Sequence, residues 1–254
     1  MNRRTEPIIQ IRGLENRFGS HIVHKDLDLD VYKGEILGMV GGSGSGKSVL
    51  LRSIVGLRKP DAGEVRLLGR DADTVHRIGV LFQRGALYSS LTVLENVALP
   101  LIEKAGLARR QANEIARVKI ALTGLPAHAP DLYPADLSGG MVKRAALARS
   151  LALDPDILFL DEPTAGLDPI GAAAFDQLLM TVRDAFGLTV FLITHDLDTL
   201  YTACDRVAVL SQKKVLVNDT LDKVAATDDP WIQAYFHGPR GRAAQLAATR
   251  LKED

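Results

Sequence analysis

The sequence has little that would suit a disulfide-stabilised, nucleic-acid-binding or membrane-spanning protein. Cys204 is the only cysteine among 254 residues, so no disulfide can form within the chain, and a reducing compartment is expected. Lys and Arg together number 31, as do Asp and Glu, so the chain has no net charge that would attract nucleic acid. No nucleic-acid partner is therefore expected.

Long hydrophobic runs are also missing. The strongest apolar stretches, residues 36–40, 157–160 and 188–193, are far shorter than the ~20 residues needed to cross a bilayer. No apolar segment follows Arg3 and Arg4, so the start of the chain does not have the pattern of a secretory signal. We therefore expect any membrane association to go through a partner protein. The composition, 46% hydrophobic and 24% charged, is that of a globular protein.

The hydrophobic pattern predicts an α/β fold in which strands and helices alternate. Residues 26–31 alternate apolar and acidic side chains, which is the period of a strand with one solvated face. Short continuous apolar runs indicate buried strands at 36–40, 78–82, 157–160, 188–193 and 206–210, with a hairpin partner at 214–217. Helical spacing predicts helices over 48–55, 107–122, 141–153, 169–186 and 196–203. Residues 84–153 are interpreted as a mostly helical subdomain inserted in the sheet.

A glycine-rich loop connects the apolar strand 36–40 to the next helix. Its sequence, Gly41-Gly42-Ser43-Gly44-Ser45-Gly46-Lys47-Ser48, fits the pattern G-x-x-x-x-G-K-[ST] in the required strand and helix context. Glycines let backbone N–H groups turn toward phosphates, and the helix adds its positive end. We expect Lys47 to bridge the β- and γ-phosphates, Ser48 to bind Mg²⁺ and Val49 to complete the site. A glycine turn without a ligand is the disfavoured alternative.

Two adjacent carboxylates follow the buried strand 157–160. Asp161 is placed to hold Mg²⁺ directly or through water, and Glu162 to polarise an attacking water. A solvated acidic turn is the alternative for such a pair. The complete phosphate loop upstream favours the chemical interpretation.

Together with four further motifs, these residues resemble the nucleotide-binding subunit of ABC transporters over about residues 8–222. Leu137-Ser138-Gly139-Gly140-Met141 is similar to the family's LSGGQ signature, with Met141 in place of Gln. The other matches are Gln83 at the Q-loop, Ala165 to Asp168 at the D-loop, His195 at the switch-histidine position and Phe18 as the aromatic residue against adenine. Taken singly, Gln83 could be a polar strand end, His195 structural and Phe18 core. Their joint order favours the family.

The resemblance implies a P-loop NTPase core with a mixed sheet, an antiparallel β subdomain and an inserted α-helical subdomain at about 84–153. The ATPase domain would span residues 7–228. ATP and Mg²⁺ would be the cofactors, and the activity ATP hydrolysis. The implied catalytic residues are Glu162, His195, Lys47 and Gln83, and the implied metal ligands are Ser48, Gln83 and Asp161.

The signature motif implies a second copy of the chain as partner. An exposed helix start stabilises a nearby anion, and in this family the helix opened by Ser138, Gly139 and Gly140 faces the γ-phosphate held by the other subunit. The nucleotide would then lie in an ATP-sandwich homodimer, with Asp168 also contributing to the site. Met141 in place of Gln is expected to change the rate modestly and the mechanism not at all.

Two stretches are similar to the ATPase of Mla-type phospholipid transporters: residues 82–88, FQRGALY, and residues 138–149, SGGMVKRAALAR. This resemblance implies phospholipid transport between the inner and outer membranes, with membrane permease subunits and a lipid-binding subunit as partners. The chain would lie at the cytoplasmic face of a bacterial inner membrane. Gly85, Ala86, Leu87 and Tyr88 would form the groove for the permease's cytoplasmic helix, or else ordinary subdomain core.

The remaining alternatives concern the tail and the function class. Residues 229–254 are predicted to be a C-terminal extension that contacts the partner ATPase, with a frayed tail as the alternative. An ABC ATPase of another import or export system, or a soluble ABC ATPase acting on ribosomes or DNA ends, is the rival function. A small-molecule kinase would leave the signature motif and His195 unexplained.

Overall fold

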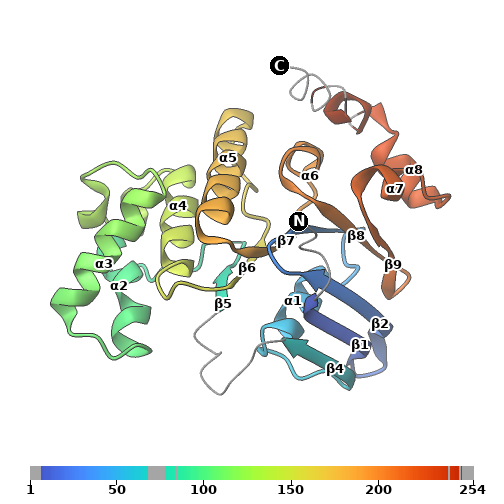
Figure 1. Cartoon of the computed structure of the whole chain (residues 1–254), viewed down its shortest axis with the longest axis horizontal. Helices are drawn as coiled ribbons and strands as arrows, with labels where there is room; N and C mark the ends of the chain where they lie inside the picture. Colours follow the sequence, from blue (N-terminus) through green and yellow to red (C-terminus); the bar gives the residue numbers. More distant parts are fainter. Residues whose placement is uncertain (1–6, 68–77, 84, 240, 246, 248–254) are drawn as a thin grey trace. The chain divides into compact units, whose positions relative to one another are not determined.

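The computed structural model describes residues 7–67, 78–83, 85–239, 241–245 and 247 (Figure 1). The chain divides into two compact units: Met1–Arg70 with Thr189–Asp254, and Asp71–Leu188. We call these the first and the second unit and describe each by itself. The expectation about Arg3 and Arg4, residue 84 at the start of the predicted helical subdomain, and the last residues of the predicted extension all lie outside the described residues.

The first unit contains a three-stranded antiparallel sheet with the order β2-β1-β4. Its strands are β1 (Pro7–Phe18), β2 (His21–Tyr32) and β4 (Ala62–Leu67). In β2 the apolar residues Leu27, Leu29 and Val31 are buried, whereas Asp26 and Asp28 are exposed. The predicted alternation is therefore confirmed, and so is the antiparallel β subdomain that the resemblance implied.

The first unit also contains part of a mixed sheet. The strands β3 (Ile36–Val40), β7 (Thr189–Ile193) and β8 (Arg206–Ser211) run parallel, with β3 between the other two, and β9 (Lys214–Asp219) is antiparallel to β8. Every residue of β3 and β7 is buried, as their continuous apolar sequences predicted. Because β3 and β7 are parallel, they end at the same edge of the sheet, where α1 (Lys47–Ile54) and α6 (Leu197–Ala203) follow.

The second unit pairs a short parallel sheet with helices. Its strands are β5 (Ile78–Leu81) and β6 (Ile157–Asp161), and its longest helix is α5 (Pro169–Phe186), capped by Asp168 and ended by Gly187 in the left-handed conformation. These elements lie where the sequence predicted them. Among the residues that the structure describes, α5 included, no helix has the length and apolarity to cross a membrane.

Three helices of the second unit enclose a core of their own. They are α2 (Val93–Glu103), α3 (Arg109–Leu122) and α4 (Gly139–Ser150), with the 3-10 turns η2 (Ala129–Asp131) and η3 (Pro134–Asp136) between α3 and α4. The periodicity did not single out α2, although Thr92 and Glu95 form a capping box at its start. The predicted helix 141–153 instead begins at Gly139, because Ser138 caps it.

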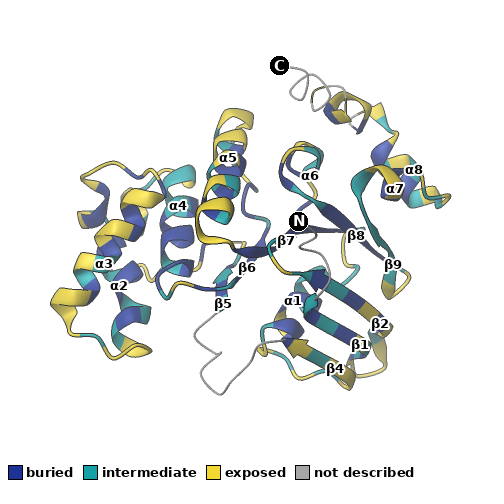
Figure 2. Ribbon diagram, viewed as in Figure 1, coloured by how far each residue is buried: buried dark blue, intermediate teal, exposed yellow. Residues whose placement is uncertain are grey.

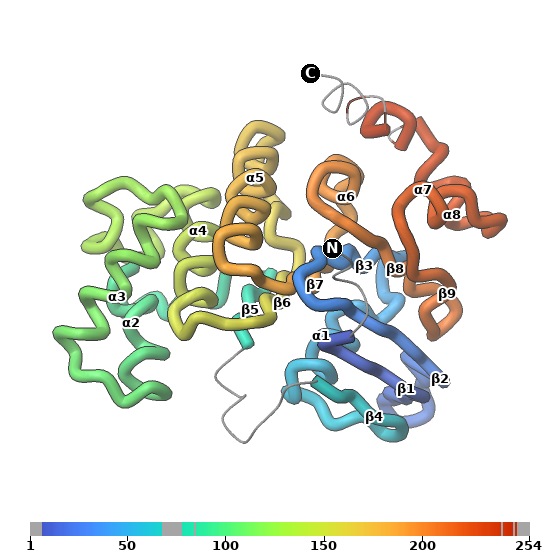
Figure 3. Tube along the Cα trace, in the orientation of Figure 1, coloured from blue at the N-terminus to red at the C-terminus, as the bar shows by residue number. Residues whose placement is uncertain are grey.

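The chain after β9 forms the short helices α7 (Leu221–Ala225) and α8 (Pro230–Phe236) in the first unit (Figure 3), and residues 241–245 are helical as well. Ile232 and Phe236 of α8 are completely buried, in one core with residues of β3, β8 and α6 (Figure 2). A frayed tail is therefore wrong for residues 230–236. The start of the predicted extension is an ordered part of the first unit.

Candidate functional site

The path of the loop between β3 and α1 depends on its glycines. Gly44 and Gly46 have positive φ angles of 75° and 102°, which residues with a Cβ adopt at a cost, and Ser45 N donates to Gly42 O at 3.1 Å. A Cβ on Gly41 would collide with the carbonyl oxygen of Leu210 in β8. The glycines are therefore needed for the path of this loop.

The start of α1 fits an anion. Gly46 is its N-cap and has no side chain to satisfy the first N–H groups, and the first turn, with Ser48 and Val49, holds no acidic residue. Lys47 Nζ donates to Gly41 O at 2.8 Å and to Gly42 O at 3.1 Å, so its ammonium group lies across the mouth of the loop. Ser45 Oγ is buried and makes no hydrogen bond within the described residues. These groups suit a phosphate chain.

A buried histidine lies against the loop. His24 is completely buried, and its Nε2 would be 2.5 Å from a Cβ on Gly46. Its Nδ1 is 3.0 Å from Asn16 Nδ2. Arg58 Nε, which can only donate, contacts Asn16 Oδ1 at 3.1 Å and so fixes the orientation of that amide. Asn16 therefore donates to Nδ1, and the ring proton lies on Nε2, toward Gly46.

Burial is the main reason why the pKa of His24 falls from 6.5 to about 4. The backbone of Gly46 opposes this shift, and the positive charge of Arg58 adds to it. The imidazole is therefore neutral at neutral pH. This buried, neutral imidazole against the loop was not predicted, although a histidine between the apolar residues 22–23 and 27 was a visible signal.

Phe18 is exposed to 51%, so the core alternative for this residue is wrong. The guanidinium of Arg58 lies over its ring, 4.1 Å from the centroid. Arg58, Asn16 and His24 thus form a continuous chain of contacts from Phe18 to Gly46. An exposed, oriented aromatic ring on the same unit as the phosphate loop is suited to stack on a planar base.

His195 follows β7 in the first unit, and its side chain is exposed. Its carbonyl oxygen accepts a hydrogen bond from Tyr235 Oη at 2.9 Å. The next residue, Asp196, caps α6 by accepting from Asp198 N at 3.0 Å. The backbone of the predicted switch histidine is therefore held on both sides. The contact from Tyr235 was not predicted.

The acidic pair lies in the second unit. Asp161 is the last residue of β6 and only 7% exposed, and Glu162 adopts a left-handed conformation with φ of 52°. Such a φ is uncommon for a residue with a side chain and needs support from its surroundings. Lys143 Nζ supplies it by donating to Glu162 O at 3.1 Å and to Gln83 O at 2.6 Å.

Lys143 is a buried cation, only 6% exposed. Burial lowers the pKa of its ammonium group, and the carboxylates of Glu162 and Asp161 counteract that shift. Lys143 belongs to the SGGMVKRAALAR stretch, but no role was predicted for it from the sequence. Its spacing was a usable signal, because it stands three, four and seven residues before the buried Ala146, Leu147 and Ser150 on one face of α4.

A second cation of α4 holds the segment after Gln83. Gln83 is exposed and lies two residues beyond the end of β5. Arg149 donates to Ala86 O at 2.7 Å and to Gly85 O at 3.0 Å, and burial lowers the pKa of its guanidinium. Because Lys143 Nζ also donates to Gln83 O, α4 holds this segment at two points.

The predicted signature residues open α4. Ser138 Oγ accepts from Met141 N at 3.3 Å, and Ser138 and Gly139 are exposed. Gly140 lies close to Leu167, whose Cδ2 would be 3.9 Å from a Cβ there. Asp168 caps α5 by accepting from Gly171 N at 2.9 Å. The second unit thus presents the starts of two helices beside each other, and neither has an acidic residue in its first turn.

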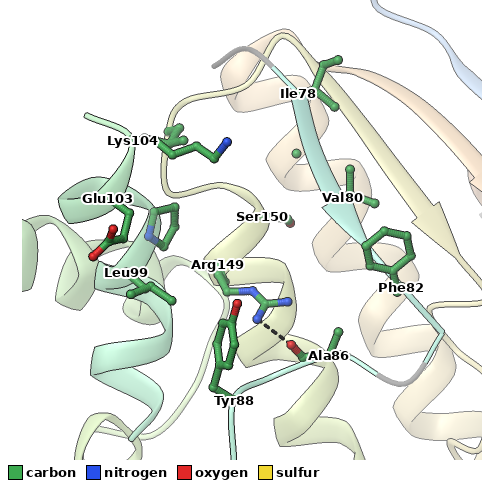
Figure 4. Close-up of a pocket in the computed structure, with 13 residues that line it drawn as sticks. Ile78, Val80, Phe82, Ala86, Tyr88, Leu99, Glu103, Lys104, Arg149 and Ser150 are labelled. Atoms are coloured by element: carbon green, nitrogen blue, oxygen red, sulfur yellow. Dashed lines mark hydrogen bonds between the residues drawn. The ribbon is translucent and has the colours of Figure 1, made fainter. Parts of the chain in front are cut away.

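A cavity of about 510 Å³ lies beside the segment bound by Arg149 (Figure 4). Figure 4 shows Tyr88, Arg149 and Phe82 around it, together with Leu99 from α2. Of the four residues predicted for a permease groove, Ala86 and Tyr88 line this cavity, Gly85 is not among its lining residues, and Leu87 packs on the core of the helices. Glu103 and Lys104 add charged groups to the cavity wall. The groove itself stays a prediction.

The structure thus distributes the predicted residues over both units. Residues 41–49, Phe18 and His195 belong to the first unit, and Gln83, Ser138, Gly139, Gly140, Asp161, Glu162 and Asp168 to the second. Within the described ranges, no three His, Cys, Asp or Glu side chains gather to hold a metal ion. Ser48 lies in the first unit and Asp161 in the second, and each taken by itself would need water or phosphate oxygens to complete a Mg²⁺ shell.

Comparison with known proteins gives concordant matches. The model of the ABC transporter family matches residues 24–165. The chain is 33% identical to the intermembrane phospholipid transport system ATP-binding protein MlaF of Haemophilus influenzae, over 91% of this chain and 90% of that protein. It is 41% identical to the methionine import ATP-binding protein MetN of Ralstonia nicotianae, over 82% of this chain and 63% of that protein.

A solved structure extends the match to three dimensions. It is the dimeric, post-hydrolysis state of the ATP-binding cassette MJ0796 bound to ADP and Pi. The TM-score is 0.74 and the identity 30%, and the match covers 84% of this chain and 98% of the other. The fold class predicted from the sequence is confirmed by this likeness.

His24 should make stability depend on pH. Its folded pKa of about 4 lies below the unfolded value of 6.5, so between these values the unfolded chain binds more protons. The free energy of unfolding should therefore fall by about 3 kcal/mol as the pH drops from 6.5 to 4, and the loss should be complete below 4. Urea unfolding across this range measures the effect.

The matched variants are His24→Leu and His21→Leu on the same strand, where His21 is exposed. His24→Leu should flatten the pH dependence in this window, and His21→Leu should leave it unchanged. Equal slopes for the parent chain and His24→Leu would contradict the assignment.

Proposed function

The chain belongs to the ABC transporter family, and we propose that it is the ATPase subunit of a transporter that moves phospholipid between the inner and outer membranes of a bacterium. Membership of the family makes it an ATP-binding protein and an ATP hydrolase. The observation that carries the proposal is the phosphate cradle, in which Gly46 leaves the start of α1 uncapped and Lys47 lies across the loop.

Residues 41–49 would hold the phosphates, and Phe18 would stack on the adenine. Lys47 would bridge the β- and γ-phosphates, while Ser48, Gln83 and Asp161 would hold Mg²⁺ directly or through water. Bound Mg²⁺ supplies charge neutralisation at the phosphate oxygens. The polar groups aimed into the loop and the near-complete burial of Asp161 support these assignments.

Glu162 would act as the general base. Its carboxylate would orient and polarise the attacking water and take up its proton. The left-handed backbone of Glu162 and the hydrogen bond from Lys143 support this role, because they restrict the direction in which the carboxylate points. His195, exposed next to a backbone held by Tyr235, would donate a hydrogen bond to the terminal phosphate.

Two copies would share the nucleotides. Ser138 and Gly139 are exposed at the start of α4, and we infer that they and Gly140 face the γ-phosphate bound by the partner copy, with Asp168 beside them. The likeness to the dimeric MJ0796 structure supports this arrangement. ATP would join the two copies, and hydrolysis would release them.

The assignment to phospholipid rests on resemblance. The FQRGALY and SGGMVKRAALAR stretches support it, as does the MlaF relative, which is matched over nearly its full length. The permease subunits would bind at the cavity lined by Ala86, Tyr88 and Leu99 and hold the chain at the cytoplasmic face of the inner membrane. A lipid-binding subunit would complete the assembly. We further propose that the ATPase domain spans 7–228, with its helical subdomain at about 84–153.

A second candidate function is the import of another solute. The methionine importer MetN is more identical to this chain than MlaF is, although the match covers a smaller part of MetN. This alternative predicts the same ATPase chemistry with different permease partners. The identity of the partners therefore decides between the two functions.

Replacing the general base should trap the dimer. Glu162→Gln keeps the shape of the side chain but cannot take up a proton, so the hydrolysis rate should fall roughly 100-fold or more. ATP binding should persist, and size-exclusion chromatography with light scattering should show ATP-dependent dimers. Monodisperse monomers in saturating ATP would contradict the shared site.

Removing the buried cation should impair hydrolysis more than binding. Lys143→Met leaves the carbonyl oxygens of Gln83 and Glu162 without this donor, so kcat should fall roughly 10- to 100-fold through misplacement of Glu162. The KM for ATP should change little, because the phosphate loop belongs to the other unit. Lys143→Arg should restore most of the rate, and a failure to do so would weaken the positioning role.

Purification of the tagged chain from membranes of its host tests the transport role. We expect a permease, a lipid-binding protein and bound phospholipid, identified by mass spectrometry. Tyr88→Asp, a 56% exposed cavity residue, should lose the permease yet keep ATP hydrolysis by the isolated chain. Val118→Asp, similarly exposed on α3, is the control. A methionine-type importer would support the second candidate, and ribosomal proteins would contradict both.

A further inference from the structure

Helix α8 carries a stacked aromatic pair on its surface. The rings of Trp231 and Tyr235 are parallel to within 13°, with centroids 4.7 Å apart, and they stand four residues apart on one face of the helix. Trp231 is the only tryptophan of the chain. The sequence predicts for residues 229–254 only a dimer contact or a frayed tail. Trp231 and Tyr235 therefore have no assigned role.

Each ring reaches a different part of the nucleotide site. Tyr235 Oη donates to the carbonyl oxygen of His195 at 2.9 Å. Trp231 lies beside the phosphate loop, since its Nε1 would be 3.8 Å from a Cβ on Gly42. The stacked pair therefore connects the loop after β3 with the loop after β7. All these residues belong to the first unit.

The helix beneath the pair is firmly anchored. Ile232 and Phe236 are completely buried in one core with Val40, the residue before the phosphate loop, and with Leu200 of α6, the helix that follows His195. Asp229 caps α8 by accepting from the N–H groups of Trp231 and Ile232 at 2.9 and 3.1 Å. Packed side chains thus join α8 to the elements that carry both loops.

We propose that Tyr235 and Trp231 are positioning residues of the nucleotide site, Tyr235 holding the backbone of His195 and Trp231 supporting the phosphate loop at Gly42. This inference rests on the proposed function, in which both loops contact ATP. A hydrogen bond to the His195 carbonyl fixes the peptide plane from which the imidazole projects. The distance between His195 and the bound phosphates would then depend on α8.

The test removes a single oxygen atom. Tyr235→Phe keeps the stacking on Trp231 and the fold but loses the hydrogen bond to His195. We expect kcat for ATP hydrolysis to fall about 3- to 10-fold, with KM within about 2-fold, because the contact concerns His195 and leaves the phosphate loop intact. Tyr32→Phe is the matched control, since Tyr32 packs under Arg206 at the opposite end of β3.

The single tryptophan provides an independent readout. Its emission should change on addition of ADP or a non-hydrolysable ATP analogue, and the change should saturate together with binding measured by equilibrium dialysis. Tyr235→Phe should retain this response. Trp231→Phe should abolish it and raise KM for ATP.

The outcomes separate this inference from the proposed function. A parent chain that hydrolyses ATP with the same kcat as Tyr235→Phe would overturn the role of Tyr235. Bound nucleotide without a change in emission would overturn the contact of Trp231 with the loop. A parent chain that neither binds nor hydrolyses ATP would overturn the proposed function, and this inference with it.

Discussion

The organisation of the first unit depends on the uncapped start of α1. Gly46 has no side chain to accept from the first N–H groups of the helix, so those groups must bind an anion or water. The strand before the loop is buried along its whole length, which prevents the loop from moving away. His24 lies beneath Gly46, and Trp231 lies beside Gly42. The surrounding residues can be understood as supports for this helix start.

A different constraint organises the second unit, the burial of the Lys143 ammonium group. A buried cation needs full hydrogen bonding, and Lys143 donates to the carbonyl oxygens of Gln83 and Glu162. These bonds join the helix opened by the signature motif, the segment beside the cavity and the proposed general base. Lys143 therefore holds the backbone of Gln83 and the backbone of Glu162 together through one side chain.

Local sequence patterns predicted much of this structure, whereas contacts between distant segments could not be predicted from the sequence. The strands 36–40 and 157–160 followed from continuous apolar runs, and the solvated face of β2 from its alternating acids. Helix α2 was not singled out, because its largely apolar sequence with Pro100 inside hides the helical period, although its capping box was readable. The contacts of His24 with Gly46 and of Tyr235 with His195 depend on tertiary packing, which no spacing along the chain encodes.

The same reasoning explains why the transported substrate is harder to infer than the activity. Phosphate binding, water activation and dimerisation, as proposed here, fit a phospholipid transporter and a methionine importer equally. In the proposed assembly, the choice of substrate would reach this chain through the permease, and hence through the surface proposed to receive it. The residues exposed at the cavity, Tyr88, Glu103 and Lys104, need not serve the chemistry and are free to differ between transport systems. If the proposed permease site is right, the information about substrate would lie in the shape and charge of that cavity.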